Sequence, residues 1–183
     1  MMTAAARYLD VTPQGVAQCM TGPPRDLPQR LLRALVLRSA GQPWSSDELA
    51  GLLPGGEPRA AAQALFRLQR DGHIVVQLEP PGDDAACGWT GLRPLLRGMI
   101  ARGAEWAALS DADGLVLECA GAQGEADPDR PHALQSGSLA LHVGEGALAA
   151  TYALTLRGAA AENEPGLVPL VRRLARWRAE RRC

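Results

Sequence analysis

The segment EPPGDDAACGWTG at residues 79–91 divides the chain into two parts. It holds two prolines, three glycines and three acidic residues, a composition that can continue neither a helix nor a strand. The stretches on both sides are long enough to bury a core. The sequence therefore predicts an N-terminal domain at 25–80, a linker at 81–90 and a second domain at 91–183, with residues 1–24 as an extension. A second polar loop of similar character covers 121–138.

Composition excludes several classes of protein. The net charge is −1, which argues against a global attraction to nucleic acid or to an anionic membrane but leaves room for a local basic patch. All 19 basic residues are arginine, and the abundant Ala, Gly and Leu indicate a GC-rich bacterial genome. The four cysteines form no CxxC pair and are expected to be free thiols in a reducing cytoplasm. No run of apolar residues is long enough for a membrane span, and the N-terminus lacks the apolar region of a signal peptide.

The first domain shows three helical signals followed by a strand. The segment 27–41 has Pro28 in its first turn, 45–53 begins with a capping box of Ser45 and Glu48, and 57–72 ends at a glycine. HIVVQLEP at 73–80 then reads as a strand. This order resembles a winged helix–turn–helix domain. Upstream, Thr12 and Pro13 favour a short helix of their own.

The helix predicted at 57–72 has one polar and one apolar face. At about 100° per residue, its polar side chains fall within an arc of roughly 80°. Such a face suits a DNA recognition helix, a protein contact or ordinary solvation. Residues 1–80 hold eight arginines against seven Asp plus Glu, a weaker basic bias than DNA-binding domains usually show. The candidate contact residues are Arg59, Gln63, Arg67 and Arg70, with Ala61, Leu65 and Leu68 on the opposite face.

The second domain opens with an amphipathic helix at 91–103 and continues with WAALSDADGLVLECAG at 106–121. The latter reads as a hairpin in which Asp111, Asp113 and Gly114 form the turn. A calcium loop in this register lacks ligands at its first and twelfth positions. Cys119 as a nucleophile needs a histidine base, for which His132 and His142 are the candidates. We expect no metal, no cofactor and no catalytic residue here.

The order of helix, glycine, strand, DADG turn and strand resembles the Roadblock family of dynein light chains and its bacterial relatives. The matching residues are Leu92–Gly103, Trp106–Ser110, Asp113–Gly114 and Leu115–Cys119, followed by SLALHV, a GEG turn, ALAATYALTL and a closing helix. The resemblance covers residues 90–182. It implies a central antiparallel sheet with helices on one face, a non-enzymatic role, dimerisation, and binding of small Ras-like GTPases. One departure is the polar loop at 121–138, where the family has a middle helix that contributes to its dimer interface.

The closing helix carries an apolar stripe of Leu167, Leu170, Val171, Leu174 and Trp177. Arg172, Arg173 and Arg176 are predicted to lie opposite it. The helix either simply packs, with its final arginines complementing the negative end of the helix dipole, or docks an acidic partner or nucleic-acid phosphates. Arg178, Arg181 and Arg182 follow at the end of the helix.

Together these patterns predict an α+β protein with a winged-helix-like domain and a reduced Roadblock-like domain. The expected function is that of a non-enzymatic, cytoplasmic regulator or scaffold that binds a protein partner or a second copy of itself. The alternative is a DNA-binding transcriptional regulator that uses residues 57–72 as its recognition helix. An enzyme built on Cys119 or on the aspartate pair is the third and weakest interpretation.

Overall fold

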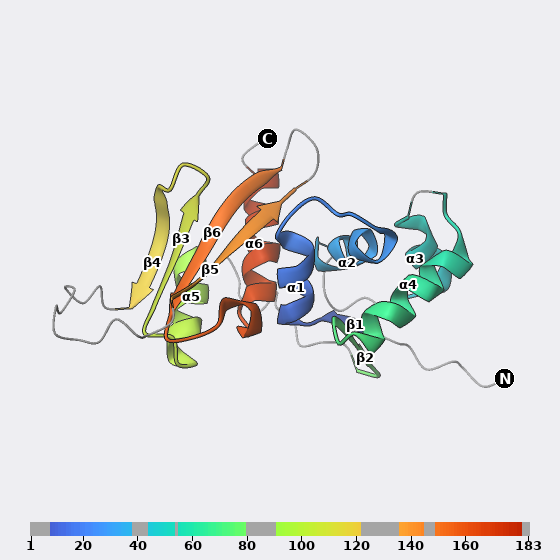
Figure 1. Ribbon diagram of the computed structural model, residues 1–183, viewed down its shortest axis with the longest axis horizontal. Helices are drawn as coiled ribbons and strands as arrows, with labels where there is room; N and C mark the ends of the chain where they lie inside the picture. Colours follow the sequence, from blue (N-terminus) through green and yellow to red (C-terminus); the bar gives the residue numbers. More distant parts are fainter. Residues whose placement is uncertain are drawn as a thin grey trace. The chain divides into compact units, whose positions relative to one another are not determined.

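The computed structural model describes residues 8–37, 44–53, 55–79, 91–121, 136–144 and 149–180 (Figure 1). The chain divides into two compact units, Met1–Gly88 and Trp89–Cys183. Both units combine helices with an antiparallel sheet, so the fold class is α+β.

Unit 1 is mainly helical and is closed by a small sheet. Its elements are β1 (Tyr8–Val11), α1 (Pro13–Met20), α2 (Leu27–Leu37), α3 (Ser46–Gly51), α4 (Pro58–Arg70) and β2 (Ile74–Gln77). Helix α2 contacts α1, α4 and β1, which makes it the centre of the unit. Leu31 and Leu32 of α2, Met20 of α1 and Ile74 of β2 are buried in this core.

Local signals in the sequence account for the helix starts. Ser45 and Glu48 form the predicted capping box, with each side chain bonded to the backbone N–H of the other residue. Thr12 caps α1 by accepting a hydrogen bond from the Gly15 N–H. The helix predicted at 27–41 is observed as Leu27–Leu37, and its expected glycine end lies outside the described residues.

The division that left residues 1–24 outside the first domain is corrected by the pairing of β1 with β2. The two strands are antiparallel, with Tyr8 opposite Gln77 and Val11 opposite Ile74. The Thr12 hydroxyl also donates to the Gly72 carbonyl, at 2.9 Å. The β1–β2 pair joins segments far apart in the sequence, and no local pattern marks such a partner. Residues 8–20 are therefore part of unit 1.

Unit 2 is a four-stranded antiparallel sheet with two long helices. Its elements are α5 (Leu92–Ala101), β3 (Trp106–Asp111), β4 (Val116–Gly121), β5 (Ser136–Val143), β6 (Ala150–Arg157), a 3₁₀ turn η3 (Ala161–Asn163) and α6 (Leu167–Glu180). The strand order is β4-β3-β6-β5. Helix α5 contacts β3, β4 and α6, while α6 contacts β5 (Figure 1).

The core of unit 2 lies where sheet and helices meet. Leu109 of β3 pairs in register with Leu154 of β6, and both are fully buried. Leu96 and Met99 of α5 and Leu170 of α6 are also fully buried.

The strands were largely foreseen in the sequence, with shifted ends. The polar loop predicted to reach residue 138 is too long, because β5 already begins at Ser136 and Gly137 pairs with Leu156. Residues 122–135 of that loop, and most of the GEG turn, lie outside the described residues. None of the helices in the described ranges combines the length and the apolar character that crossing a membrane requires.

Candidate functional site

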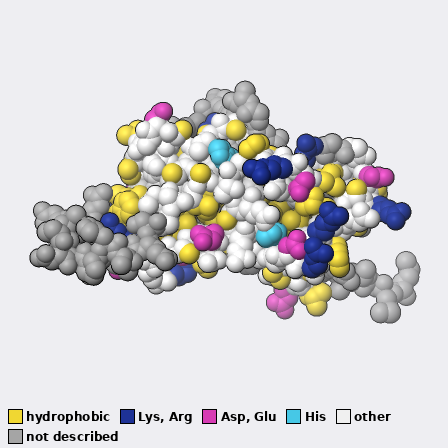
Figure 2. All heavy atoms as spheres, viewed as in Figure 1, with side chains coloured by type: hydrophobic (Ala, Val, Ile, Leu, Met, Phe, Trp, Pro, Cys, Tyr) yellow, Lys and Arg dark blue, Asp and Glu magenta, His cyan; other side chains and the backbone are white. Residues whose placement is uncertain are grey.

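The exposed face of α4 carries the residues singled out in the sequence. Arg59, Gln63, Arg67 and Arg70 are all exposed, and basic side chains gather over this helix in Figure 2. The opposite side of α4 is buried through Ala61, Ala64 and Leu68, while Leu65 is half-buried. The polar arc is thus brought to the surface of unit 1 as one patch.

Phe66 belongs to the same face and was missed in the sequence. Its side chain is 66% exposed. At about 100° per residue it falls next to Arg59 and Arg70 on the helix circumference. Two signals could have identified it: it is the only phenylalanine of the chain, and it lies off the apolar stripe of its helix. We call Arg59, Gln63, Phe66, Arg67 and Arg70 the α4 patch.

The charges of the α4 patch are little neutralised. Arg70 Nε lies 3.0 Å from Asp71 Oδ1, but both side chains are well exposed, and such pairs contribute little to stability. Arg59 and Arg67 form no ion pair with any other residue that the structure describes. Their guanidinium groups remain accessible to a partner.

The arginines of α6 do not form the surface expected from the sequence. Arg172 is only 6% exposed, which corrects its assignment to an outward face. The cause is Val168, a buried residue one turn earlier that widens the apolar stripe on that side. Arg173 is half-buried, and its Nη1 lies 3.5 Å from Glu180 Oε1. Of the three arginines, only Arg176 is exposed.

The aspartates of the β3–β4 hairpin act on its backbone. Asp111 Oδ1 accepts hydrogen bonds from the backbone N–H groups of Asp113 (3.0 Å) and Leu115 (2.9 Å). Gly114 has a φ of +81°, a conformation that favours glycine. The predicted turn is confirmed. Within the described ranges, no group of three His, Cys, Asp or Glu side chains could hold a metal ion.

Sheet topology separates the residues considered for nucleophilic chemistry. Cys119 lies on β4 and His142 on β5, the two edge strands. At ~4.8 Å per strand they are roughly 14 Å apart across the sheet. The register places Cys119 in one row with Ser138 of β5, so His142 is also displaced by four residues along the strands. The His142 ring instead lies 2.9 Å from the Thr151 hydroxyl. The other candidate base, His132, lies outside the described residues.

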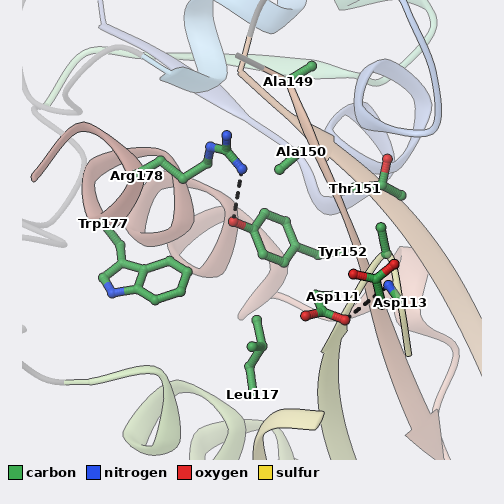
Figure 3. Close-up of a pocket in the computed structure, with 10 residues that line it drawn as sticks. Asp111, Asp113, Leu117, Ala149, Ala150, Thr151, Tyr152, Trp177 and Arg178 are labelled. Atoms are coloured by element: carbon green, nitrogen blue, oxygen red, sulfur yellow. Dashed lines mark hydrogen bonds between the residues drawn. The ribbon is translucent and has the colours of Figure 1, made fainter. Parts of the chain in front are cut away.

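Unit 2 contains a cavity of about 620 Å³ beside the same hairpin (Figure 3). Tyr152, Trp177 and Leu117 form its apolar walls, and Arg178 and Asp111 also line it. A smaller hollow, which shares Leu117 and Trp177, continues toward the start of α5. No sequence pattern indicated this cavity, because its residues come from four separate segments.

We compared the chain with protein-family models, with curated proteins and with solved structures. None of them matches.

Proposed function

We propose that this protein is a non-enzymatic bacterial regulator or scaffold that binds a protein partner through the α4 patch. The observation that carries the proposal is Phe66, an exposed aromatic ring within a face of arginines. Covering such a ring with a partner surface is favourable, because it removes apolar area from water. Aromatic residues and arginine are also the residue types enriched at protein–protein interfaces.

The charge distribution indicates the chemistry of the partner. Unit 1 holds eight arginines and nine Asp plus Glu residues, so it is not basic as a whole. Three of the eight arginines, Arg59, Arg67 and Arg70, nevertheless lie on the α4 patch. A complementary surface has an apolar pocket for the Phe66 ring and carboxylates around it.

The resemblance of unit 2 to the Roadblock family suggests which partners to test first. The resemblance implies an antiparallel sheet with an opening and a closing helix, and unit 2 contains these elements. Small Ras-like GTPases and a second copy of the chain are therefore the first candidates, in a cytoplasmic setting.

DNA binding is the second candidate function, and the composition of the α4 patch favours it specifically. Arginine pairs with guanine edges or phosphates, and glutamine pairs with adenine. Phosphate contacts supply most of the affinity of DNA-binding proteins, however, and unit 1 offers no general positive field. For this reason we place DNA binding second.

Fluorescence anisotropy with a mixed-sequence duplex, at low and at physiological salt, separates the two candidates. A protein-binding patch leaves the duplex free at both salt concentrations. Binding at low salt that is lost in the Arg59→Ala/Arg67→Ala/Arg70→Ala variant would replace our proposal by DNA recognition.

Photo-crosslinking in cells tests the proposal directly. A photoreactive phenylalanine analogue is placed at Gln63, within the α4 patch, or at Gln18, an exposed glutamine of α1 in the same unit. We expect a crosslinked protein from Gln63 only, at a yield that falls when Phe66 is changed to Ser. Equal products from both positions, or a yield indifferent to Phe66→Ser, would contradict the proposal.

A further inference from the structure

The cavity of unit 2 is built around Tyr152. This side chain is 4% exposed and lies on β6, directly opposite Asp111 of β3 in the sheet register. Trp177 of α6 and Leu117 of β4 form further walls, and Figure 3 shows the three side chains around one space. A volume of about 620 Å³ is in the range of pockets that take small molecules.

Side chains of opposite charge lie near the two ends of the Tyr152 side chain. At the hydroxyl end, Arg178 Nη1 donates a hydrogen bond to the tyrosine oxygen, at 3.4 Å. At the backbone end lies Asp111, with Asp113 beside it at the rim (Figure 3). The two opposite charges therefore lie at opposite ends of the Tyr152 side chain.

Both charged groups keep hydrogen-bonding capacity for a ligand. A guanidinium has five N–H donors, and the bond to Tyr152 uses one of those of Arg178. The Asp111 carboxylate holds the hairpin turn through Oδ1, and a carboxylate has two oxygens. Neither group needs to give up its structural role in order to bind.

We infer that this cavity binds a small aromatic zwitterion whose ammonium and carboxylate groups lie at opposite ends of one ring. The ring lies against Tyr152, Trp177 and Leu117, the ammonium meets Asp111 and Asp113, and the carboxylate meets Arg178. A para-substituted ring has the dimensions of the tyrosine side chain that separates the two charges. A ligand with only one of the charges would forgo the charge-assisted hydrogen bonds at the other end of the cavity.

A matched set of probes tests this inference. Para-(aminomethyl)benzoate carries both charges, para-methylbenzylamine lacks the carboxylate, para-methylbenzoate lacks the ammonium, and para-xylene lacks both. Each probe is titrated into the full chain, and the NMR shift of the Trp177 indole N–H, assigned with Trp177→Phe, reports binding. We expect the zwitterion to bind about tenfold more tightly than either singly charged probe, equivalent to ~1.4 kcal/mol.

Two variants assign each charge to its end. Asp111→Asn keeps an oxygen acceptor for the turn and should weaken zwitterion binding while leaving para-methylbenzoate unaffected. Arg178→Gln should weaken zwitterion binding while leaving para-methylbenzylamine unaffected. Thermal unfolding of both variants checks that the fold is intact.

The inference is overturned if no probe shifts the Trp177 signal, or if all four probes bind equally well. It is also overturned if both variants, correctly folded, bind the zwitterion as the wild type does. None of these results would bear on the proposed role of the α4 patch, because the cavity and the patch belong to different units.

Discussion

Single residues in unit 1 tolerate change to very different degrees. Gly15 lies in α1 so close to the turn after α4 that an added Cβ would overlap the His73 carbonyl oxygen. Gly51, at the end of α3, has open space around its Cα. Both glycines are helical, so the difference between them is a matter of packing.

We expect Gly15→Ala to lower the free energy of unfolding by about 1–3 kcal/mol, because the helix must move away from the turn. Gly51→Ala is the matched control and should leave stability unchanged or raise it by up to ~1 kcal/mol. Urea denaturation of the two variants measures both effects. Equal stability of the two variants would contradict the close approach at Gly15.

Cys19 is a residue whose chemistry is set by burial. The residue is 2% exposed, and burial raises the pKa of its thiol from 9.0 to about 12, although the nearby Arg33 opposes the shift. A pKa raised in the folded state contributes stability that is complete below the pKa of the unfolded chain. That stability is lost as pH rises through 9 toward 12, because only the unfolded chain then releases the proton.

The stability advantage of the wild type over Cys19→Ala should therefore shrink above pH 9, by up to about 1.4 kcal/mol per pH unit. Denaturation of both proteins at pH 8 and pH 10 measures this difference, in which the other titrating groups cancel. A difference that is constant with pH would show that the thiol is not buried.

Helix starts and turns could be predicted from the sequence where a few neighbouring residues define them. The capping box of Ser45 and Glu48 and the Asp111 turn are complete within a few residues, and both were predicted. The position of Arg172 was not, because the width of a buried stripe depends on what packs against it. Phe66, by contrast, lies off the apolar stripe of its helix, so helical periodicity could have indicated its exposure.

Helix α4 should respond to mutation according to the face that is changed. Leu68 is 3% exposed, and Leu68→Ala should lower the free energy of unfolding by about 2–5 kcal/mol. Phe66→Ala removes a larger but exposed side chain and should change stability by less than about 0.5 kcal/mol. Thermal and urea denaturation measure both. A large loss of stability in Phe66→Ala would show that the ring is packed in the fold and not reserved for a partner.

An ion pair connects the end of α5 with the start of α6. Arg102 Nε donates to Glu164 Oε1 at 2.6 Å, and the same oxygen accepts from the Gly166 N–H at 3.1 Å. Glu164 is buried, whereas Arg102 is 42% exposed. The Glu164 carboxylate therefore does two things: it pairs with Arg102, and it holds the backbone just before the first residue of α6.

Changing Glu164 to Gln keeps an oxygen acceptor for Gly166 and should destabilise unit 2 by about 1 kcal/mol. Glu164→Ala also leaves the Gly166 N–H without its acceptor, so its loss should be larger, about 2–3 kcal/mol. Denaturation curves of the two variants give both values. If the two variants lose equal stability, the hydrogen bond to Gly166 does not contribute to the free energy of unfolding.

On the scale of the whole molecule, the chain consists of two units with separate cores. The sequence predicts the junction within the segment 79–91, because its proline- and glycine-rich composition disfavours both helix and strand. Composition did not show that unit 1 includes its N-terminal strand and helix. Sequence patterns predict the secondary structure of each segment well, but they do not indicate which distant segment packs against it or pairs with it.

Fragments of the chain should reflect this organisation. Residues 1–88 contain both strands of the unit 1 sheet and should unfold cooperatively as an isolated fragment. Residues 25–88 lack β1 and α1, including the fully buried Val16 and Met20, and should not fold. Circular dichroism during heating compares the two fragments. A cooperative transition in the shorter one would show that β1 and α1 are dispensable.

The pairing of Tyr8 with Gln77 also determines when unit 1 can complete its folding during protein synthesis. Helices α2, α3 and α4 contain mainly local contacts and can form while the chain is still growing, whereas the strand pair joins the two ends of the unit. We expect β1 to remain unpaired until β2 has emerged from the ribosome. Closure of the sheet is then expected to be the last step in the folding of unit 1, and until it happens the nascent chain exposes an unpaired β-strand to chaperones and to neighbouring chains.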